Sequence, residues 1–98
     1  MKTTKTQYFL WKKDDSDTVL IYAPSAATTE GVTYYIKNYG NCEFSKYIWR
    51  DSFDPLAGIK FALKRHNYRL VCSLLIPSDH TTKDLAKYYN TIKKNLSL

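Results

Sequence analysis

The sequence predicts an α+β domain, an α/β sandwich in which a small sheet is covered by helices. Short runs rich in aromatic and β-branched residues alternate with segments that carry apolar residues at helical spacing. The 98 residues are enough for one domain, residues 1–98, with residues 1–5 as a disordered tail. The hydrophobic share of 44% and the nine tyrosines are enough for a packed core.

The first two elements are predicted to be strands that form an antiparallel hairpin. Residues 6–13 (TQYFLWKK) are rich in aromatics, and residues 18–23 (TVLIYA) are rich in β-branched residues. The DDSD segment at residues 14–17 is a turn, because Asp and Ser side chains bond to their own backbone there. Pro24 then ends the second strand.

Residues 25–40 (SAATTEGVTYYIKNYG) change to helical spacing and predict the first helix. Thr28 or Thr29 can cap its start, and Gly40 suits the position after its end. Gly31 within the first turn is unfavourable for a helix. The predicted buried stripe has apolar residues at i, i+3, i+4 and i+7, which are Val32, Tyr35, Ile36 and Tyr39.

Residues 42–49 (CEFSKYIW) alternate and predict a third strand. A helix over residues 55–66 follows, because Asp54 is a good N-cap and Pro55 is favoured at the first helical position. The apolar stripe of this helix is predicted to face the core, and it consists of Leu56, Ile59 and Leu63.

Residues 68–76 (YRLVCSLLI) form the most apolar segment and predict a central strand that is buried on both faces. Thr81 and Asp84 resemble a capping box before a last helix over residues 82–95. The apolar stripe of that helix consists of Leu85, Tyr88, Tyr89, Ile92 and Leu96. The predicted order is β-β-α-β-α-β-α, a four-stranded mixed sheet with three helices packed on it.

The formal net charge is +6, and it is unevenly distributed. Nine of the 15 Lys and Arg residues but only four of the nine acidic residues follow Trp49. These cations lie mainly on helix faces opposite the apolar stripes, which suits contacts to nucleic-acid phosphates. The predicted phosphate contacts are Lys60, Lys64, Arg65, Arg69, Lys83, Lys87 and Lys94. Lysines on a helix face are also common as solvated residues without a partner.

Several aromatic residues are candidates for an interface. Phe61 lies between Lys64 and Arg65, where it either stacks on bases or faces another layer of core. Tyr34 falls off the first predicted apolar stripe. Tyr47 and Trp49 alternate with Phe44 and Ile48, so either pair is exposed if the sheet is covered on one face, and both are buried otherwise. The candidate interface aromatics are therefore Tyr34, Tyr47 and Trp49.

No catalytic residue, metal site or cofactor is predicted. The acidic turn fails the calcium-loop pattern, since counting from Asp15 the sixth position is Leu20 and the twelfth is Ala26. Glu43 and Lys46 fall on opposite faces of a strand, which argues against a nuclease site. His66 and His80 belong to no catalytic motif, although a pocket that joined either of them to Cys42 or a carboxylate would favour a small enzyme.

The leading functional prediction is a non-enzymatic module that binds DNA or RNA through its basic C-terminal half, largely independently of sequence. The alternative is a protein-interaction or inhibitor module. It would bind an acidic protein through its basic face, or use an aromatic strand face or a free sheet edge to bind a host protein or a second copy as a homodimer. The Lys-, Asn- and Tyr-rich composition suits a phage or viral accessory protein. With no signal peptide, Cys42 and Cys72 are expected to be reduced thiols in a cytoplasmic protein without a membrane partner.

Overall fold

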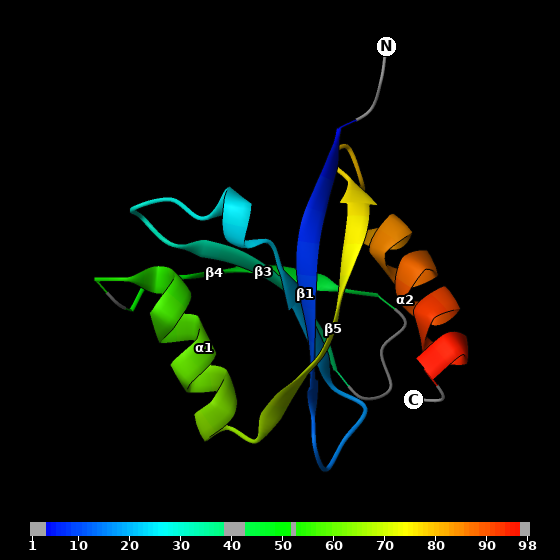
Figure 1. The fold of residues 1–98 in the computed structure, drawn as a ribbon, viewed down its shortest axis with the longest axis horizontal. Helices are drawn as coiled ribbons and strands as arrows, with labels where there is room; N and C mark the ends of the chain where they lie inside the picture. Colours follow the sequence, from blue (N-terminus) through cyan, green and yellow to red (C-terminus); the bar gives the residue numbers. More distant parts are fainter. Residues whose placement is uncertain (1–3, 39–42, 52, 97–98) are drawn as a thin grey trace.

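The computed structural model describes residues 4–38, 43–51 and 53–96, which form a five-stranded antiparallel sheet with one helix on each face (Figure 1). The strands are β1 (Lys5–Lys13), β2 (Val19–Tyr22), β3 (Val32–Lys37), β4 (Ser45–Trp49) and β5 (Tyr68–Pro77). The helices are α1 (Pro55–Arg65) and α2 (Thr82–Leu96), with a short 3₁₀ turn, η1 (Pro24–Ala26). The α+β class is confirmed, with five strands in place of four and two α-helices in place of three.

The predicted hairpin is confirmed. β1 and β2 pair antiparallel with Phe9 opposite Tyr22, and the backbone N–H of Lys13 donates to Thr18 O at 3.0 Å to close the turn. The Lys12 ammonium donates to the carbonyl of Ser16 at 3.1 Å across the same turn. Of the predicted disordered tail, Lys5 opens β1, and residues 1–3 lie outside the described residues.

The helix predicted over residues 25–40 is wrong, because β3 occupies residues 32–37, and the predicted end of that helix at Tyr39 and Gly40 lies outside the described residues. The sequence VTYYIK is β-branched and aromatic, and its alternate residues Val32 and Ile36 face α1 while Tyr35 faces α2. A stripe of apolar residues at i, i+3 and i+4 cannot be distinguished from such a strand when both of its faces are buried. Thr28 caps no helix and instead closes a tight turn, in which its backbone N–H donates to Gly31 O at 2.9 Å.

The predicted mixed sheet is also wrong, because every strand pair is antiparallel in the order β4-β3-β2-β1-β5. After β4 the chain crosses one face of the sheet as α1 and adds β5 beside β1 at the opposite edge (Figure 1). β5 is therefore an edge strand, and the prediction that it is central and buried fails. Leu70 and Leu75 are exposed, the latter by 62%.

The two faces of the sheet bury separate cores, because alternate residues of β1 and β2 point to opposite sides. The core under α2 contains Tyr8, Leu10, Val19, Ile21, Phe44, Ile76, Leu85 and Tyr89. The core under α1 contains Trp11, Leu20, Tyr22, Val32, Ile59 and Leu63. The sheet is thus the middle layer of three, with α1 packed on one face and α2 on the other.

The helix α1 begins and ends where local chemistry requires. The Asp54 side chain accepts a hydrogen bond from the backbone N–H of Ala57 at 3.3 Å, and Pro55 occupies the first turn, as predicted. Asn67 has φ of 66° directly after the helix, a left-handed conformation that Asn tolerates better than most residues. The backbone N–H of Asn67 donates to Lys64 O at 3.2 Å, which ends the helix and turns the chain into β5.

The capping box predicted before α2 is confirmed. The backbone N–H of Thr81 donates to Asp84 Oδ2 at 3.0 Å, and the backbone N–H of Asp84 donates to Thr81 Oγ1 at 3.2 Å. The bond from the Thr81 backbone is the main reason why the pKa of Asp84 lies below its ordinary value of 3.8. Tyr88, predicted to lie on the buried stripe, is exposed, whereas Leu85 and Tyr89 are buried as expected.

The lowered pKa of Asp84 predicts how the stability depends on pH. The carboxylate stabilises the fold above its unfolded-state pKa, and this contribution is lost as the pH falls through the lower folded-state value. We expect Asp84→Asn to lose less thermal stability than the parent between about pH 6 and about pH 3. Asp84→Glu should keep the parent dependence, because Glu also completes a capping box. Equal acid sensitivity of the parent and Asp84→Asn in thermal melts would contradict this.

Two further expectations concern the thiols and the membrane. Cys72 is a free thiol whose pKa is raised by burial, and Cys42 lies outside the described residues. Within the described ranges, neither helix has the length and hydrophobicity needed to cross a membrane.

Candidate functional site

The outer surface of α1 carries a cluster of cations around an exposed phenylalanine. Ile59 and Leu63 are buried against the sheet, and their position on the helix turns Lys60, Phe61 and Lys64 toward solvent. Phe61 is 68% exposed, so the alternative that it faces another layer of core is wrong. We call the group formed by Lys60, Phe61, Lys64, Arg65 and Arg69 the α1 basic surface. All five residues are exposed.

A groove joins α1 to the edge strand β5 on one side of this surface. It encloses about 490 Å³, with Trp11, Tyr68 and Leu70 on its walls and three cations at its rim, Lys60, Lys64 and Arg69. Arg69 Nε lies 3.6 Å from Asp14 Oδ1, and both side chains are more than half exposed. Solvent screens an exposed pair of this kind, so Arg69 is available to a phosphate at little cost.

A second hollow, of about 710 Å³, borders the other side of the α1 basic surface. Phe61 and Arg65 line it together with His66 and Trp49. Trp49 reaches α1 from β4 at the far edge of the sheet, so the structure brings this predicted interface aromatic beside Phe61. Its indole Nε1 is buried and has no hydrogen-bond partner among the described residues. Asp51 also lines the hollow and makes it less cationic than the groove.

The predicted lysines of α2 do not belong to this surface. Lys83, Lys87 and Lys94 are exposed, but α2 packs on the opposite face of the sheet from α1. Figure 1 shows the sheet between the two helices. The cationic residues predicted together therefore form two separate surfaces, and one bound strand cannot contact both without passing around the sheet.

The tyrosines predicted for an interface occupy the β3–β4 end of the sheet. Tyr34 and Tyr47 stack with ring centroids 5.7 Å apart and an interplanar angle of 26°. Tyr47 is 49% exposed, whereas Tyr34 is half-buried and faces the space beneath α1. Burial raises the pKa of Tyr34, and the neighbouring Tyr47 raises it further. Ile48 is exposed on the other face of β4. Neither the Phe44/Ile48 pair nor the Tyr47/Trp49 pair is therefore fully covered.

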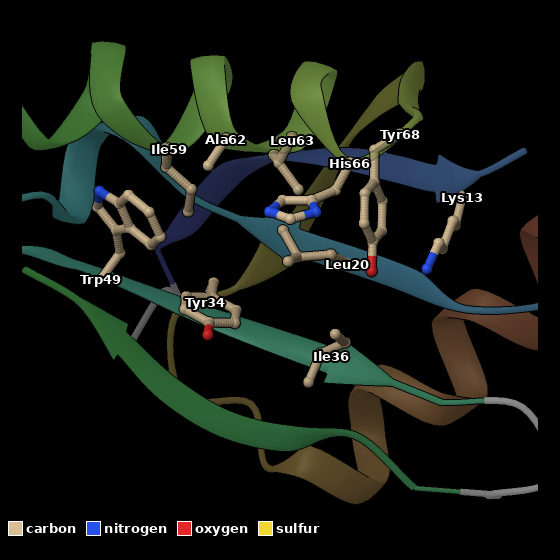
Figure 2. Close-up of a pocket in the computed structure, with 10 residues that line it drawn as sticks. All are labelled: Lys13, Leu20, Tyr34, Ile36, Trp49, Ile59, Ala62, Leu63, His66 and Tyr68. Carbon is tan, nitrogen blue, oxygen red and sulfur yellow. The ribbon is translucent and has the colours of Figure 1, made fainter. Parts of the chain in front are cut away.

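A cleft of about 270 Å³ lies between α1 and the sheet (Figure 2). Leu20, Ile36, Ile59 and Leu63 give it an apolar interior. Its remaining lining residues are Lys13, Tyr34, Trp49, Ala62, His66 and Tyr68, and they include all of its polar groups. The sequence did not indicate this cleft, because its walls come from β1, β2, β3, β4, α1 and β5 and depend on the sheet order.

His80 lies in an aromatic cluster on the other face of the sheet. Its Nδ1 bonds to the carbonyl of Pro77 at 2.9 Å, and its Nε2 lies 3.5 Å from the hydroxyl of Tyr8. Its ring packs edge-on against both Tyr8 and Tyr35. Burial, followed by the effect of Tyr35, raises the pKa of Tyr8 to about 12, so this phenol is a poor nucleophile at neutral pH.

The described residues contain no group of three or more His, Cys, Asp or Glu side chains that could hold a metal ion. His66 and His80 lie on opposite faces of the sheet, so they do not meet in one site. Sequence reasoning missed the three walls of the β5 groove, which are Trp11, Tyr68 and Leu70. The one indication in the sequence was that Tyr68 and Leu70 follow the basic helix by a few residues.

Comparison with protein-family models, curated proteins and solved structures finds no match to this chain.

Proposed function

We propose that this protein binds single-stranded nucleic acid through the α1 basic surface, largely independently of sequence. The observation that carries the proposal is Phe61, an aromatic side chain 68% exposed on a helix whose other exposed side chains include Lys60, Lys64 and Arg65. Phe61 is one of several exposed large apolar side chains, Phe53 among them, and a single one needs no partner to explain it. What favours a partner at Phe61 is its position beside Lys64 and Arg65, which follow it by three and four residues on the same helix. An aromatic face among cations matches the way in which proteins hold unpaired strands, by stacking on bases and contacting phosphates.

The grooves on either side of α1 support the same assignment. The cations at the rim of the β5 groove would contact consecutive phosphates, while Tyr68 and Leu70 offer flat or apolar walls to a base. The proposal excludes Lys83, Lys87 and Lys94 from the interface, because they lie on the opposite face. It also narrows the predicted partner from DNA or RNA in general to single-stranded nucleic acid, since the paired bases of a duplex are not free to stack on Phe61.

The first test is the salt dependence of binding to a single-stranded oligonucleotide, measured by fluorescence anisotropy. We expect Lys60→Gln combined with Lys64→Gln and Arg65→Gln to weaken binding about 10- to 100-fold at low salt, because three phosphate contacts are lost. The log–log salt slope should fall by about 0.7 for each cation removed. The matched control carries Lys83→Gln, Lys87→Gln and Lys94→Gln, which remove the same charge from α2. It should bind like the parent.

A second variant separates stacking from charge. Phe61→Ala should weaken single-strand binding about 5- to 150-fold, since base–aromatic stacking is worth about 1–3 kcal/mol. It should change duplex binding much less and leave the salt slope unchanged. Tyr88→Ala removes an exposed aromatic from α2 and serves as its control. The proposal is rejected if the parent fails to bind at low salt, or if the α2 variants weaken binding as much as the α1 variants do.

A protein partner is the second candidate, and the free edges of the sheet favour it. Among the strands that the structure describes, β4 and β5 each pair on one side only, and they expose Tyr47, Ile48, Leu70 and Leu75. Edge strands with exposed apolar residues pair readily with another chain, including a second copy. Retention of a specific protein from a nuclease-treated lysate by the α1 triple variant would support this candidate. Monomers in sedimentation experiments would exclude self-pairing at the concentrations used.

A further inference from the structure

The cleft beneath α1 is separate from the α1 basic surface and has its own chemistry. Its apolar walls are formed by Leu20, Ile36, Ile59 and Leu63, and the benzene part of the Trp49 indole closes one end (Figure 2). The cleft is open to solvent and has a volume of about 270 Å³. Small-molecule sites commonly combine an apolar interior with a few polar groups on the wall, in volumes of roughly 300–1,000 Å³, so this cleft suits only a small ligand.

A lysine and a tyrosine lie at the end opposite Trp49, and a histidine lies between them and Trp49 (Figure 2). Figure 2 shows the Lys13 ammonium and the Tyr68 hydroxyl directed toward this end, and the His66 ring enters from the residue that follows α1. The ten residues that line the cleft include no Asp or Glu. Within the described part of the chain, no hydrogen bond or ion pair occupies the Lys13 ammonium. This end of the cleft is therefore complementary to an anion.

The two tyrosines add hydrogen-bond donors. Burial raises the pKa of Tyr68, and the neighbouring Tyr34 raises it further, so its phenol keeps its proton at neutral pH. A protonated phenol beside a cation can donate a charge-assisted hydrogen bond to an anionic oxygen. With a single lysine and no glycine-rich loop, the site lacks the several cations and backbone donors that a phosphate group usually requires.

We propose that the cleft binds a small apolar carboxylic acid, with its carboxylate at Lys13, His66 and Tyr68 and its apolar body between α1 and β3. This inference goes beyond nucleic-acid binding and does not depend on it, because Lys13, Tyr34 and Ile36 line neither groove beside α1, although Tyr68 lines both the cleft and the β5 groove. An apolar amine would place a cation beside Lys13, and an apolar alcohol would leave that ammonium without its counter-charge.

Octanoate is a suitable probe, and the two tryptophans report where it binds. Trp49 lines both the cleft and the hollow beside Phe61, whereas Trp11 lines the β5 groove. A Trp49 shift therefore excludes the β5 groove, and the Lys13→Gln variant distinguishes the cleft from the hollow, which Lys13 does not line. In two-dimensional NMR spectra, we expect octanoate to shift the indole N–H signal of Trp49 in a saturable way and to leave that of Trp11 in place. A dissociation constant on the order of 0.1–1 mM is expected for a ligand of about ten non-hydrogen atoms. Octylammonium should give no saturable shift.

Two pairs of variants test the assignment. Lys13→Gln should weaken octanoate binding about tenfold, as expected when one charged hydrogen-bond partner is removed. Lys46→Gln makes the same change on the exposed face of β4 and should have no effect. Ala62→Phe places a ring in the cleft and should abolish binding, whereas Ala57→Phe adds the same ring on the exposed side of α1.

Several outcomes would overturn the proposal. The first is the absence of a Trp49 shift at about 10 mM octanoate, which is well above the expected dissociation constant. The second is equal binding of octylammonium and octanoate. The third is octanoate binding by Lys13→Gln that is as tight as that of the parent. A shift confined to Trp11 would also overturn it by locating the ligand in the β5 groove. Oligonucleotide binding by the same samples is measured separately, so failure of one proposal leaves the other to be judged on its own data.

Discussion

Replacing Leu10 by alanine is expected to lower the free energy of unfolding by about 2–5 kcal/mol. Leu10 is fully buried in β1, which has β2 on one side and β5 on the other. Its register partners are Ile21 and Cys72, and it packs in the core that α2 covers. Truncation removes buried apolar surface and leaves a cavity that the sheet backbone cannot fill by moving.

The size of this effect can be judged against the whole domain. A chain of this length is typically stable by about 5–15 kcal/mol, so Leu10→Ala removes a large part of the total. Urea unfolding followed by circular dichroism measures the change. Leu75→Ala is the matched control, because it makes the same substitution in an edge strand at a residue that is 62% exposed. It should cost less than about 1 kcal/mol. Similar losses in the two variants would contradict the layered core.

Gly31→Ala is expected to destabilise the fold by about 2–4 kcal/mol, for two reasons that add together. Gly31 has φ of 156°, a backbone conformation that residues with a side chain rarely adopt. A Cβ atom added there would overlap the backbone carbonyl oxygen of Trp49 and would come within 3.0 Å of Ile48 Cγ2. The overlap involves backbone, so it can be relieved only by moving β4 away from the start of β3.

The control for this prediction is Gly58→Ala within α1. Alanine is favoured over glycine inside a helix by about 1 kcal/mol, so this variant should gain stability or stay unchanged. A displaced β4 would also alter the environment of Trp49, which an NMR spectrum of the indole N–H would report. If Gly31→Ala unfolds at the same urea concentration as the parent, the close approach of Gly31 to β4 is incorrect.

The local signals in the sequence were reliable where they depend on chemistry between near neighbours. The Asp54–Pro55 start of α1, the Thr81–Asp84 capping box and the turn at residues 14–17 were all predicted, because each is decided by side chains bonding to adjacent backbone. The same reasoning failed for residues 25–40. There the choice between helix and strand depends on whether Tyr34 and Tyr35, which lie on opposite faces of the strand, are both covered. The residues that cover them come from distant segments.

The uneven charge was also visible in the sequence, but its arrangement was not. Composition and order alone place most of the basic excess after Trp49 and put Lys60, Lys64 and Arg65 on one helix. The spacing of Leu56, Ile59 and Leu63 further predicted which side of that helix turns to solvent. Helical periodicity is a property of a single segment, so these features need no knowledge of the rest of the chain.

Only the tertiary structure decided how the segments meet. The antiparallel order β4-β3-β2-β1-β5 puts α1 and α2 on opposite faces, separates their lysines, exposes Phe61 and carries Trp49 to the side of α1. It also forms the cleft, in which Lys13 of β1 and Tyr68 of β5 lie together although they are far apart in the sequence. Strand order follows from which apolar surfaces cover one another, and that is settled by contacts between residues far apart in sequence.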